Sequence, residues 1–136
     1  MTRSVSIDRE LPHPPEKVWR VLTESGLIEE WLMKTTFEPV VGREFEFRTE
    51  PMPHWDGVVK GEVLEVEPES RLSYRWEAGD NLRTVVTWTL EPTEIGTMLR
   101  MRQSGFTDAD EHNYRGAQYG WVKFLGMLDD VLENIK

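Results

Sequence analysis

The sequence contains no cysteine, and this absence excludes several kinds of site at once. Without thiols the chain forms no disulfide, binds no metal through a thiolate and carries no cysteine nucleophile, which fits an intracellular protein best. Long apolar runs are also missing, since no segment approaches the ~20 apolar residues of a membrane span. The first residues, Met1 to Leu11, alternate between polar and apolar, so we expect no signal peptide. These absences together predict a cytoplasmic protein.

Basic residues are scarce relative to acidic ones: 16 Lys and Arg stand against 25 Asp and Glu, a net charge of -9. Nucleic acids and anionic membranes both require clustered basic residues, so we expect neither as a partner. A chain of 136 residues is long enough for one domain with one substantial core. No linker, repeat or low-complexity segment divides it, so we expect a single domain over residues 1–136.

The most regular feature that is present is an amphipathic helix at the C-terminal end. From Tyr114 on, apolar residues recur on one stripe at ~100° per residue, while Lys123 and Glu133 fall on the other side. Thr107, followed by Asp108, matches a helix N-cap with acidic charge in the first turn. A helix of roughly 30–40 Å needs a broad concave surface to lie on. The apolar stripe consists of Tyr114, Ala117, Trp121, Phe124, Leu125, Leu128, Leu132 and Ile135.

The preceding chain supplies such a surface as an antiparallel sheet. Val5 to Leu11 alternates as a half-buried strand, and Pro15 then opens the first of two short helices that Ser25-Gly26 separates. From Phe37 on, strands and turns alternate, and one of the strand segments runs from Trp55 to Glu67. Short connections predict antiparallel neighbours, and one apolar face predicts a sheet that is solvated on its other side. The fold class is therefore α+β.

Several motifs, in a fixed order over nearly the whole chain, resemble one known family. They are Pro14-Pro15-Glu16-Lys17-Val18-Trp19 with Trp31, Gly61–Pro68, Arg71–Trp76, Gly96–Leu99, Ser104-Gly105-Phe106 and Gly120-Trp121. Together they are similar to the family named after the activator of heat-shock protein 90 ATPase, in its stand-alone bacterial form. That family lies in the START-like, pollen-allergen-like (SRPBCC) helix-grip superfamily. The resemblance implies a sheet of about six or seven strands curved around the C-terminal helix, with two short helices after the first strand. These motifs are turn glycines, core aromatics and hairpin prolines, so they identify a scaffold rather than an activity.

Aromatic residues on the inner faces of sheet and helix form the candidate site. Alternate turns of a meander lie at the same end, so the Glu50–His54 loop, the Ala78–Asn81 turn and the Ser104–Glu111 connection are expected to share one rim and form a mouth. Gly116 and Gly120, near this rim, either permit close packing or loosen the first turns of the helix. The aromatics either fill a core or line an apolar cavity of the kind that binds small molecules, and the resemblance favours the cavity. The candidate ligand-binding residues are Phe45, Phe47, Trp55, Tyr74, Trp76, Val86, Trp88, Met101, Gln103, Tyr114, Ala117 and Trp121.

Other groups that carry chemistry form no recognisable site. Asp108, Asp110 and His112 match no metal-ligand template, and a helix cap accounts for the acids, so we expect neither a metal nor a cofactor. Arg9 lies in the apolar phase of the first strand. This position favours a covered stem with the charged head in water over an inward charge that awaits an anionic ligand.

Three functions remain as hypotheses. The first is a non-catalytic protein that binds a hydrophobic or aromatic small molecule between the helix and the sheet. The second is a cyclase- or hydrolase-like enzyme in the same pocket, which needs an acid or base from Tyr74, Arg9, His54 or His112. The third is a chaperone-partner module, as the family name suggests. We do not expect a chaperone partner, because one domain leaves no room for the extra N-terminal domain of the eukaryotic activators. The lack of a catalytic constellation favours the first hypothesis.

Overall fold

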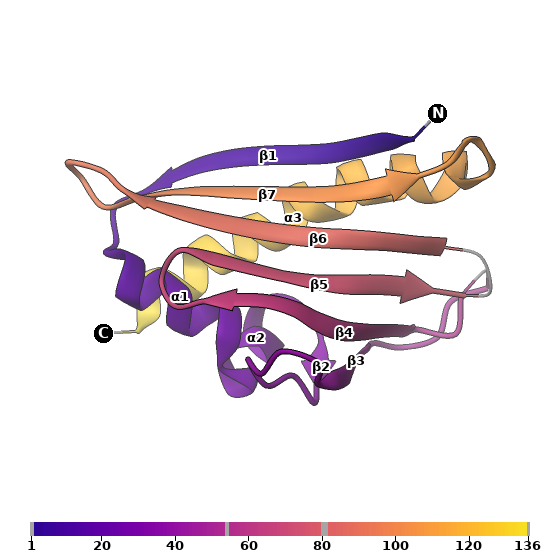
Figure 1. Cartoon of the computed structure of the whole chain (residues 1–136), viewed down its shortest axis with the longest axis horizontal. Coiled ribbons are helices and arrows are strands. Elements are labelled where there is room, and N and C mark those ends of the chain that lie inside the picture. Colours follow the sequence, from indigo (N-terminus) through magenta and orange to yellow (C-terminus); the bar gives the residue numbers. More distant parts are fainter. Residues whose placement is uncertain (1, 54, 80–81, 136) are drawn as a thin grey trace.

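A computed structural model describes residues 2–53, 55–79 and 82–135, which form a seven-stranded antiparallel sheet curved around one long helix (Figure 1). In chain order the elements are β1 (Arg3–Leu11), α1 (Pro15–Thr23), α2 (Ser25–Trp31), β2 (Lys34–Thr35), β3 (Glu44–Arg48), β4 (Val58–Glu67), β5 (Arg71–Ala78), β6 (Leu82–Pro92), β7 (Thr97–Phe106), the 3-10 turn η1 (Asp108–Asp110) and α3 (Glu111–Asn134). The strand order is β1-β7-β6-β5-β4-β3-β2, so β2 to β7 form a meander that β1 extends beside β7. The predicted helix-grip fold is confirmed.

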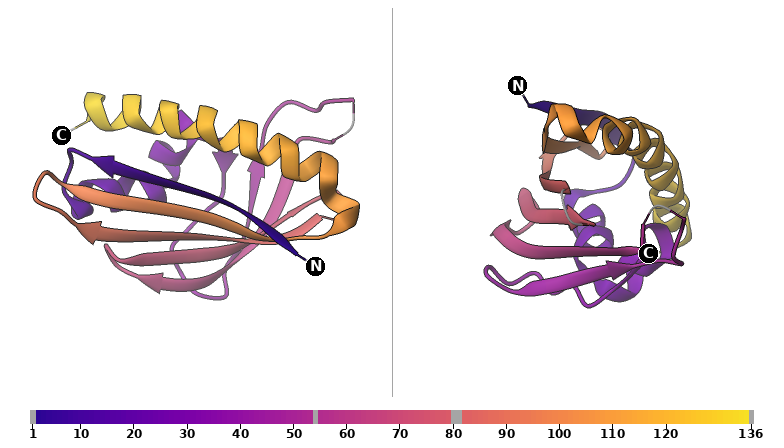
Figure 2. Two further views of the ribbon diagram at one scale, coloured as in Figure 1. Left: turned by 90° about the horizontal axis from the view of Figure 1, so that it is seen from above. Right: turned by 90° about the vertical axis from the view of Figure 1, so that its right-hand side faces the viewer.

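The protein has two layers with one core between them. Figure 2 shows the sheet curling around α3, with α1 and α2 on the same concave side near the C-terminal end of α3. Alternation places Leu72, Tyr74 and Trp76 of β5 on the inner face, where they pair in register with Trp88, Val86 and Thr84 of β6. All six of these side chains are buried.

The two halves of α3 differ in how they meet this core. Its buried residues are Trp121, near the middle of the helix, and Leu125, Leu128, Val131 and Leu132 of the second half. Upstream of the helix, the Asp110 carboxylate accepts hydrogen bonds from the backbone N–H of Thr107 at 2.8 Å and from the Thr107 hydroxyl at 2.9 Å. Thr107 is the N-cap of η1, so the predicted start of the helical segment is confirmed.

Two strand boundaries differ from those that the sequence pattern predicts. Strands and turns were predicted to alternate from Phe37 on, but the segment 36–43 is irregular. The strand in this region, β2, lies earlier, at Lys34–Thr35. Pro39 within that segment has no backbone N–H to donate to a neighbouring strand. The strand predicted from Trp55 starts instead at Val58, because Gly57 adopts a positive φ of 81° that interrupts the extended backbone.

Candidate functional site

A cavity of about 520 Å³ lies between the N-terminal half of α3 and one end of the sheet. The loop before β4, the β5–β6 turn and the connection from β7 into α3 surround it, and all three lie at the same end of the sheet (Figure 1). Met52 of the loop, Gly79 of the turn and Phe106, the last residue of β7 before the connection, all line it. The common rim predicted from the meander is confirmed for the described residues, and His54, Asp80 and Asn81 lie outside them.

The cavity exists because α3 presents small residues to the sheet along its first turns. Gly116, Ala117 and Gly120 all line the cavity. A Cβ atom added to Gly116 would meet nothing within 4 Å, and one added to Gly120 would meet only a ring atom of Phe124 at 3.9 Å. Of the two roles considered for these glycines, close packing is therefore wrong. They leave space beside the helix.

Aromatic and aliphatic carbon forms most of the cavity wall. Trp55, Trp76, Phe106, Trp121 and Phe124 supply the aromatic part. The Trp55 indole N–H donates to the carbonyl of Val58 at 2.9 Å, and the Trp121 indole N–H donates to the side chain of Gln103 at 2.7 Å. Since both N–H groups are already used, these two rings offer mainly carbon surface to a ligand.

Gln103 is the deepest polar group of the lining, at 1% exposure. An indole N–H only donates, so the atom facing Trp121 must be the amide oxygen of Gln103. The amide nitrogen therefore points the other way and donates to the hydroxyl of Thr84 at 2.9 Å. That hydroxyl in turn donates to the carbonyl of Trp76 at 2.7 Å. This chain of hydrogen bonds holds the carboxamide in one orientation at the back of the cavity.

The structure separates the predicted ligand-binding residues into two groups and one outlier. Five of them line the cavity: Trp55, Trp76, Gln103, Ala117 and Trp121. Six belong to the filled core and do not reach the cavity: Phe45, Phe47, Tyr74, Val86, Trp88 and Met101. Tyr114 also lies outside the lining, where the Arg3 guanidinium covers its ring at 4.1 Å. A filled core and a cavity therefore coexist at different ends of the same interior.

Trp121 marks the boundary between these two regions. Its ring centroid lies 5.2 Å from that of Trp76 and 5.7 Å from that of Trp88. Trp88 in turn contacts Trp31 of α2 at 5.8 Å between centroids. Toward the N-terminal end of α3 the same indole borders the cavity. Trp121 is therefore part of both the filled core and the cavity wall.

Several lining residues were not among the predicted site residues. Phe124 lies on the predicted helical stripe, so the periodicity already indicated its inward direction. Met33 and Met52 come from loops, where neither period 2 nor period 3.6 predicts a direction, whereas Leu82 starts β6 in phase with the inward-facing Val86. Only the spatial convergence of these segments assigns them to the wall.

Of the four residues proposed as an acid or base, only His112 lines the cavity among the described residues. The Tyr74 hydroxyl is buried in the core, where it accepts a hydrogen bond from the indole of Trp88 at 3.0 Å, and burial raises its pKa. Arg9 donates to the carboxylate of Asp129 on α3 at 2.6 Å. Its head is therefore in an ion pair, neither in water alone nor awaiting a ligand. His54 lies outside the described residues.

The raised pKa of Tyr74 has a measurable consequence at alkaline pH. The folded protein keeps this proton above pH ~10, whereas the unfolded chain releases it, so stability falls as pH rises beyond that value. We expect Tyr74→Phe to flatten this fall in denaturation experiments and to leave the phenolate absorbance of the folded protein unchanged. Tyr119→Phe, at a 79% exposed position, is the control for loss of a tyrosine hydroxyl outside the core. Loss of phenolate absorbance in the folded Tyr74→Phe variant would contradict the burial.

The metal site considered at the start of the helix is not assembled. Asp110 is engaged by Thr107, and no group of three His, Asp or Glu in the described part of the chain is arranged to hold a metal ion. Both acids of this segment belong to the first turn of η1, as expected for a cap.

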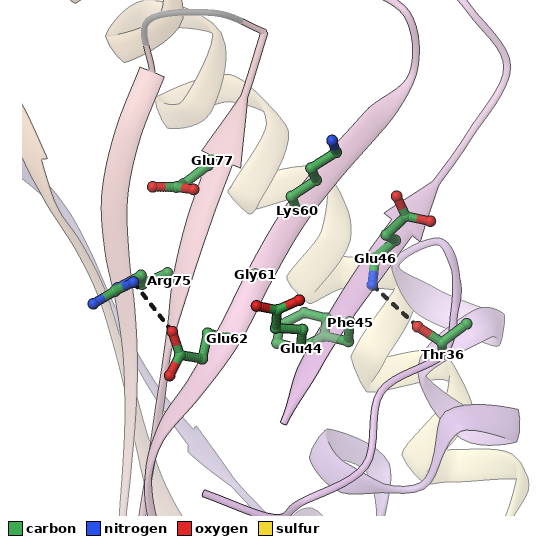
Figure 3. A pocket seen from close by; sticks show the side chains of 9 residues that line it. All are labelled: Thr36, Glu44, Phe45, Glu46, Lys60, Gly61, Glu62, Arg75 and Glu77. Atoms are coloured by element: carbon green, nitrogen blue, oxygen red, sulfur yellow. Dashed lines mark hydrogen bonds and ion pairs between the residues drawn. The ribbon is translucent and has the colours of Figure 1, made fainter. Parts of the chain in front are cut away.

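A second depression, of about 430 Å³, lies on the outer face of the sheet beside Gly61 (Figure 3). Its rim carries charged side chains of β3, β4 and β5, among them Arg75 and Glu62, which are 3.1 Å apart. The hydroxyl of Thr36 accepts a hydrogen bond from the backbone N–H of Glu46 at 3.1 Å. Arg75 and Glu62 are both partly exposed, and such pairs contribute little to stability. This depression is a solvated, charge-paired face rather than an apolar site.

Comparisons with known proteins relate the chain to others of the same fold. Protein MLL2253 from Mesorhizobium loti is 46% identical, with a TM-score of 0.92 over 98% of this chain and 99% of that one. Protein CV1439 from Chromobacterium violaceum is 26% identical, with a TM-score of 0.75 over 96% and 97% of the two chains. DynU16, a protein in the dynemicin biosynthetic locus, is 25% identical, with a TM-score of 0.81 over 96% of this chain and 47% of its own.

Three further observations concern the relatives of the chain, its helices and its family. The search of the curated proteins gave no match. Within the described residues, no helix combines the length and apolarity that a membrane crossing requires. The family model for activator of Hsp90 ATPase homolog 1-like proteins matches residues 12–133, which is most of the chain. By this match, and with the helix-grip fold around it, the chain belongs to the family of activator of Hsp90 ATPase homolog 1-like proteins.

Proposed function

We propose that this protein is a non-catalytic binding protein, which holds a hydrophobic or aromatic small molecule between α3 and the sheet. The cavity of about 520 Å³ carries this proposal. Sites for small molecules are typically concave, mostly apolar and roughly 300–1,000 Å³ in volume, with a few polar groups that orient the ligand. Here the wall is mainly aromatic and aliphatic, and Gln103, His112 and Asn113 provide the polar groups.

The surrounding structure supports a site rather than a packing defect. Among the described residues no buried side-chain nitrogen or oxygen lacks a hydrogen-bond partner, and the rest of the interior is filled by aromatic contacts. The cavity lies where α3 carries Gly116 and Gly120. The similarity to DynU16, which belongs to a biosynthetic locus, agrees with a ligand that is a small organic molecule.

Tryptophan fluorescence tests the proposal directly. Trp55, Trp76 and Trp121 line the cavity, so a ligand that enters it changes their environment. We expect a saturable change in emission, at one molecule per chain, with at least one compound of a panel of flavonoids, lipids and polyketides. Silence across the panel, together with a crystal structure in which side chains fill the cavity, would overturn the proposal.

The same complex separates this proposal from its alternatives. A cyclase- or hydrolase-like enzyme would convert a bound compound. Because we propose a non-catalytic protein, we expect chromatography to recover the compound unchanged after long incubation. A chaperone-partner module would stimulate the ATPase of heat-shock protein 90, and we expect no stimulation. Conversion of the compound that depends on His112, the titratable group of the described lining, would favour the enzyme instead.

A further inference from the structure

We propose that the cavity selects neutral ligands that carry a hydroxyl or carbonyl oxygen and rejects carboxylates, an inference that rests on the proposed function. The observation behind it is the charge of the wall. No lysine, arginine, aspartate or glutamate occurs among the described residues that line the cavity. His112 is the one titratable group of this lining, and it lies at the exposed mouth.

Two cationic side chains close to the lining, Arg3 and Arg83, already have anionic partners. Arg3, at the start of β1, pairs with Glu111 and covers the ring of Tyr114 at 4.1 Å. Arg83, next to the lining residue Leu82, pairs with Glu77 at 3.1 Å. A ligand carboxylate would therefore have to break one of these two ion pairs to reach Arg3 or Arg83.

The cost of desolvation makes a cavity without charged residues discriminate against carboxylate ligands. A carboxylate that enters an apolar cavity loses its hydration shell, and without a cation in the wall nothing replaces it. The net charge of -9 adds a long-range repulsion of anions. A neutral molecule of the same skeleton buries the same carbon surface without either penalty.

Gln103 defines what a neutral ligand gains at the back of the cavity. A carboxamide has two N–H donors and two acceptor lone pairs. Trp121 takes one lone pair of Gln103 and Thr84 takes one N–H, so one donor and one acceptor remain. An alcohol, phenol or ketone oxygen is complementary to this remainder. Asn113 offers the same chemistry at the mouth.

Two probes of one skeleton test the inference: 9-anthracenemethanol and 9-anthracenecarboxylate. Both are titrated by quenching of tryptophan emission at about pH 8, above the ordinary titration range of carboxyl and imidazole groups. We expect the alcohol to bind roughly tenfold or more tightly than the carboxylate. Comparable affinities of the two probes would overturn the inference.

A charge placed in the wall sharpens the test. Asn113→Lys puts an ammonium group in the lining, and we expect it to narrow the preference for the alcohol by roughly fivefold or more. Gln118→Lys is the matched control, because it adds the same charge to an exposed position of α3 that does not line the cavity. The control is expected to leave the preference unchanged. An equal effect of both variants would assign the discrimination to overall charge and overturn the role of the wall.

The two proposals fail in different ways. Gly120→Leu places a side chain in the cavity. If both probes bind the parent equally well, and this variant weakens the binding of both, the binding function stands and the charge selectivity is wrong. If neither probe binds, the selectivity is overturned, and silence across the panel as well overturns the binding function. Tight binding of the alcohol alone, lost in Gly120→Leu and retained in Gln118→Lys, supports both.

Discussion

Replacement of Trp121 by leucine is expected to lower the free energy of unfolding by about 3–4 kcal/mol. The indole is 2% exposed and packs against the rings of Trp76, Trp88 and Phe124, with centroids 5.2, 5.7 and 5.8 Å away. Leucine is smaller than the indole and cannot restore these contacts, so a void remains at the end of the filled core. The missing volume joins the existing cavity, which hinders collapse of the neighbours around it.

The same substitution also removes a buried hydrogen bond. The Trp121 indole donates to the amide oxygen of Gln103 at 2.7 Å, and leucine has no donor. A buried acceptor left without a partner accounts for about 1–3 kcal/mol of that loss. Urea denaturation measures the total, and Tyr119→Leu on the outer side of α3 is the control. Tyr119 is 79% exposed, so its change is expected to stay within about 0.5 kcal/mol.

The result decides what Trp121 does for the protein. A loss below about 1 kcal/mol, close to that of an exposed position, would show that the ring is loosely held and serves the cavity alone. The expected larger loss would show that the ring closes the core in addition to lining the cavity. Affinity measured on this variant reports both effects, so the role of the cavity itself needs a variant that does not touch the core.

Gly120→Leu is that variant, and it is expected to weaken ligand binding roughly ten- to hundredfold without destabilising the protein. A Cβ atom at Gly120 would lie 3.9 Å from Phe124, an ordinary contact, and the remaining carbons of leucine would occupy the cavity. Glycine is among the weakest helix formers, so leucine also favours α3 by roughly 0.5–1 kcal/mol. The leucine side chain therefore weakens binding, because it occupies the cavity. It does not weaken the fold, because it raises the helix propensity of α3.

Gly126 provides a matched control on the same helix. A Cβ atom at Gly126 would meet nothing within 4 Å, and this residue is exposed and does not line the cavity. Gly126→Leu is expected to change helix propensity alone and to leave binding as in the parent. The measurements are fluorescence titration and urea denaturation of both variants. Unchanged binding in Gly120→Leu would move the ligand out of this cavity and contradict the proposed site.

Local pattern was enough to predict the elements of the fold. The stripe from Tyr114 to Ile135 predicted the long helix, and alternation predicted the strands, because both periods follow from backbone geometry alone. Failures occurred where the backbone departs from that geometry, at Pro39 and at the positive φ of Gly57. The common rim of the cavity was also predictable, because alternate turns of an antiparallel meander lie at the same end of the sheet.

The pattern also determined which side chains face inward, and the twelve predicted site residues are all buried or half-buried. It did not determine which of them touch one another. Trp88 and Trp76 lie on neighbouring strands with the same inward direction, yet Trp88 belongs to the filled core and Trp76 also reaches the cavity. Whether an inward-facing aromatic ring is packed in the core or borders the cavity depends on the volume of the side chains opposite it on α3.

That volume is a property of the tertiary structure. Trp121 and the larger residues after it set the distance of the helix axis from the sheet, α1 and α2. Because that distance is kept along the whole helix, the smaller residues Gly116, Ala117 and Gly120 leave room beside it. A rigid helix cannot bend toward the sheet wherever its side chains become small. The sequence by itself determined the helix, its apolar face and the position of the small residues. The cavity, and the convergence of Met33, Met52 and Leu82 on its wall, was decided only when these segments packed together.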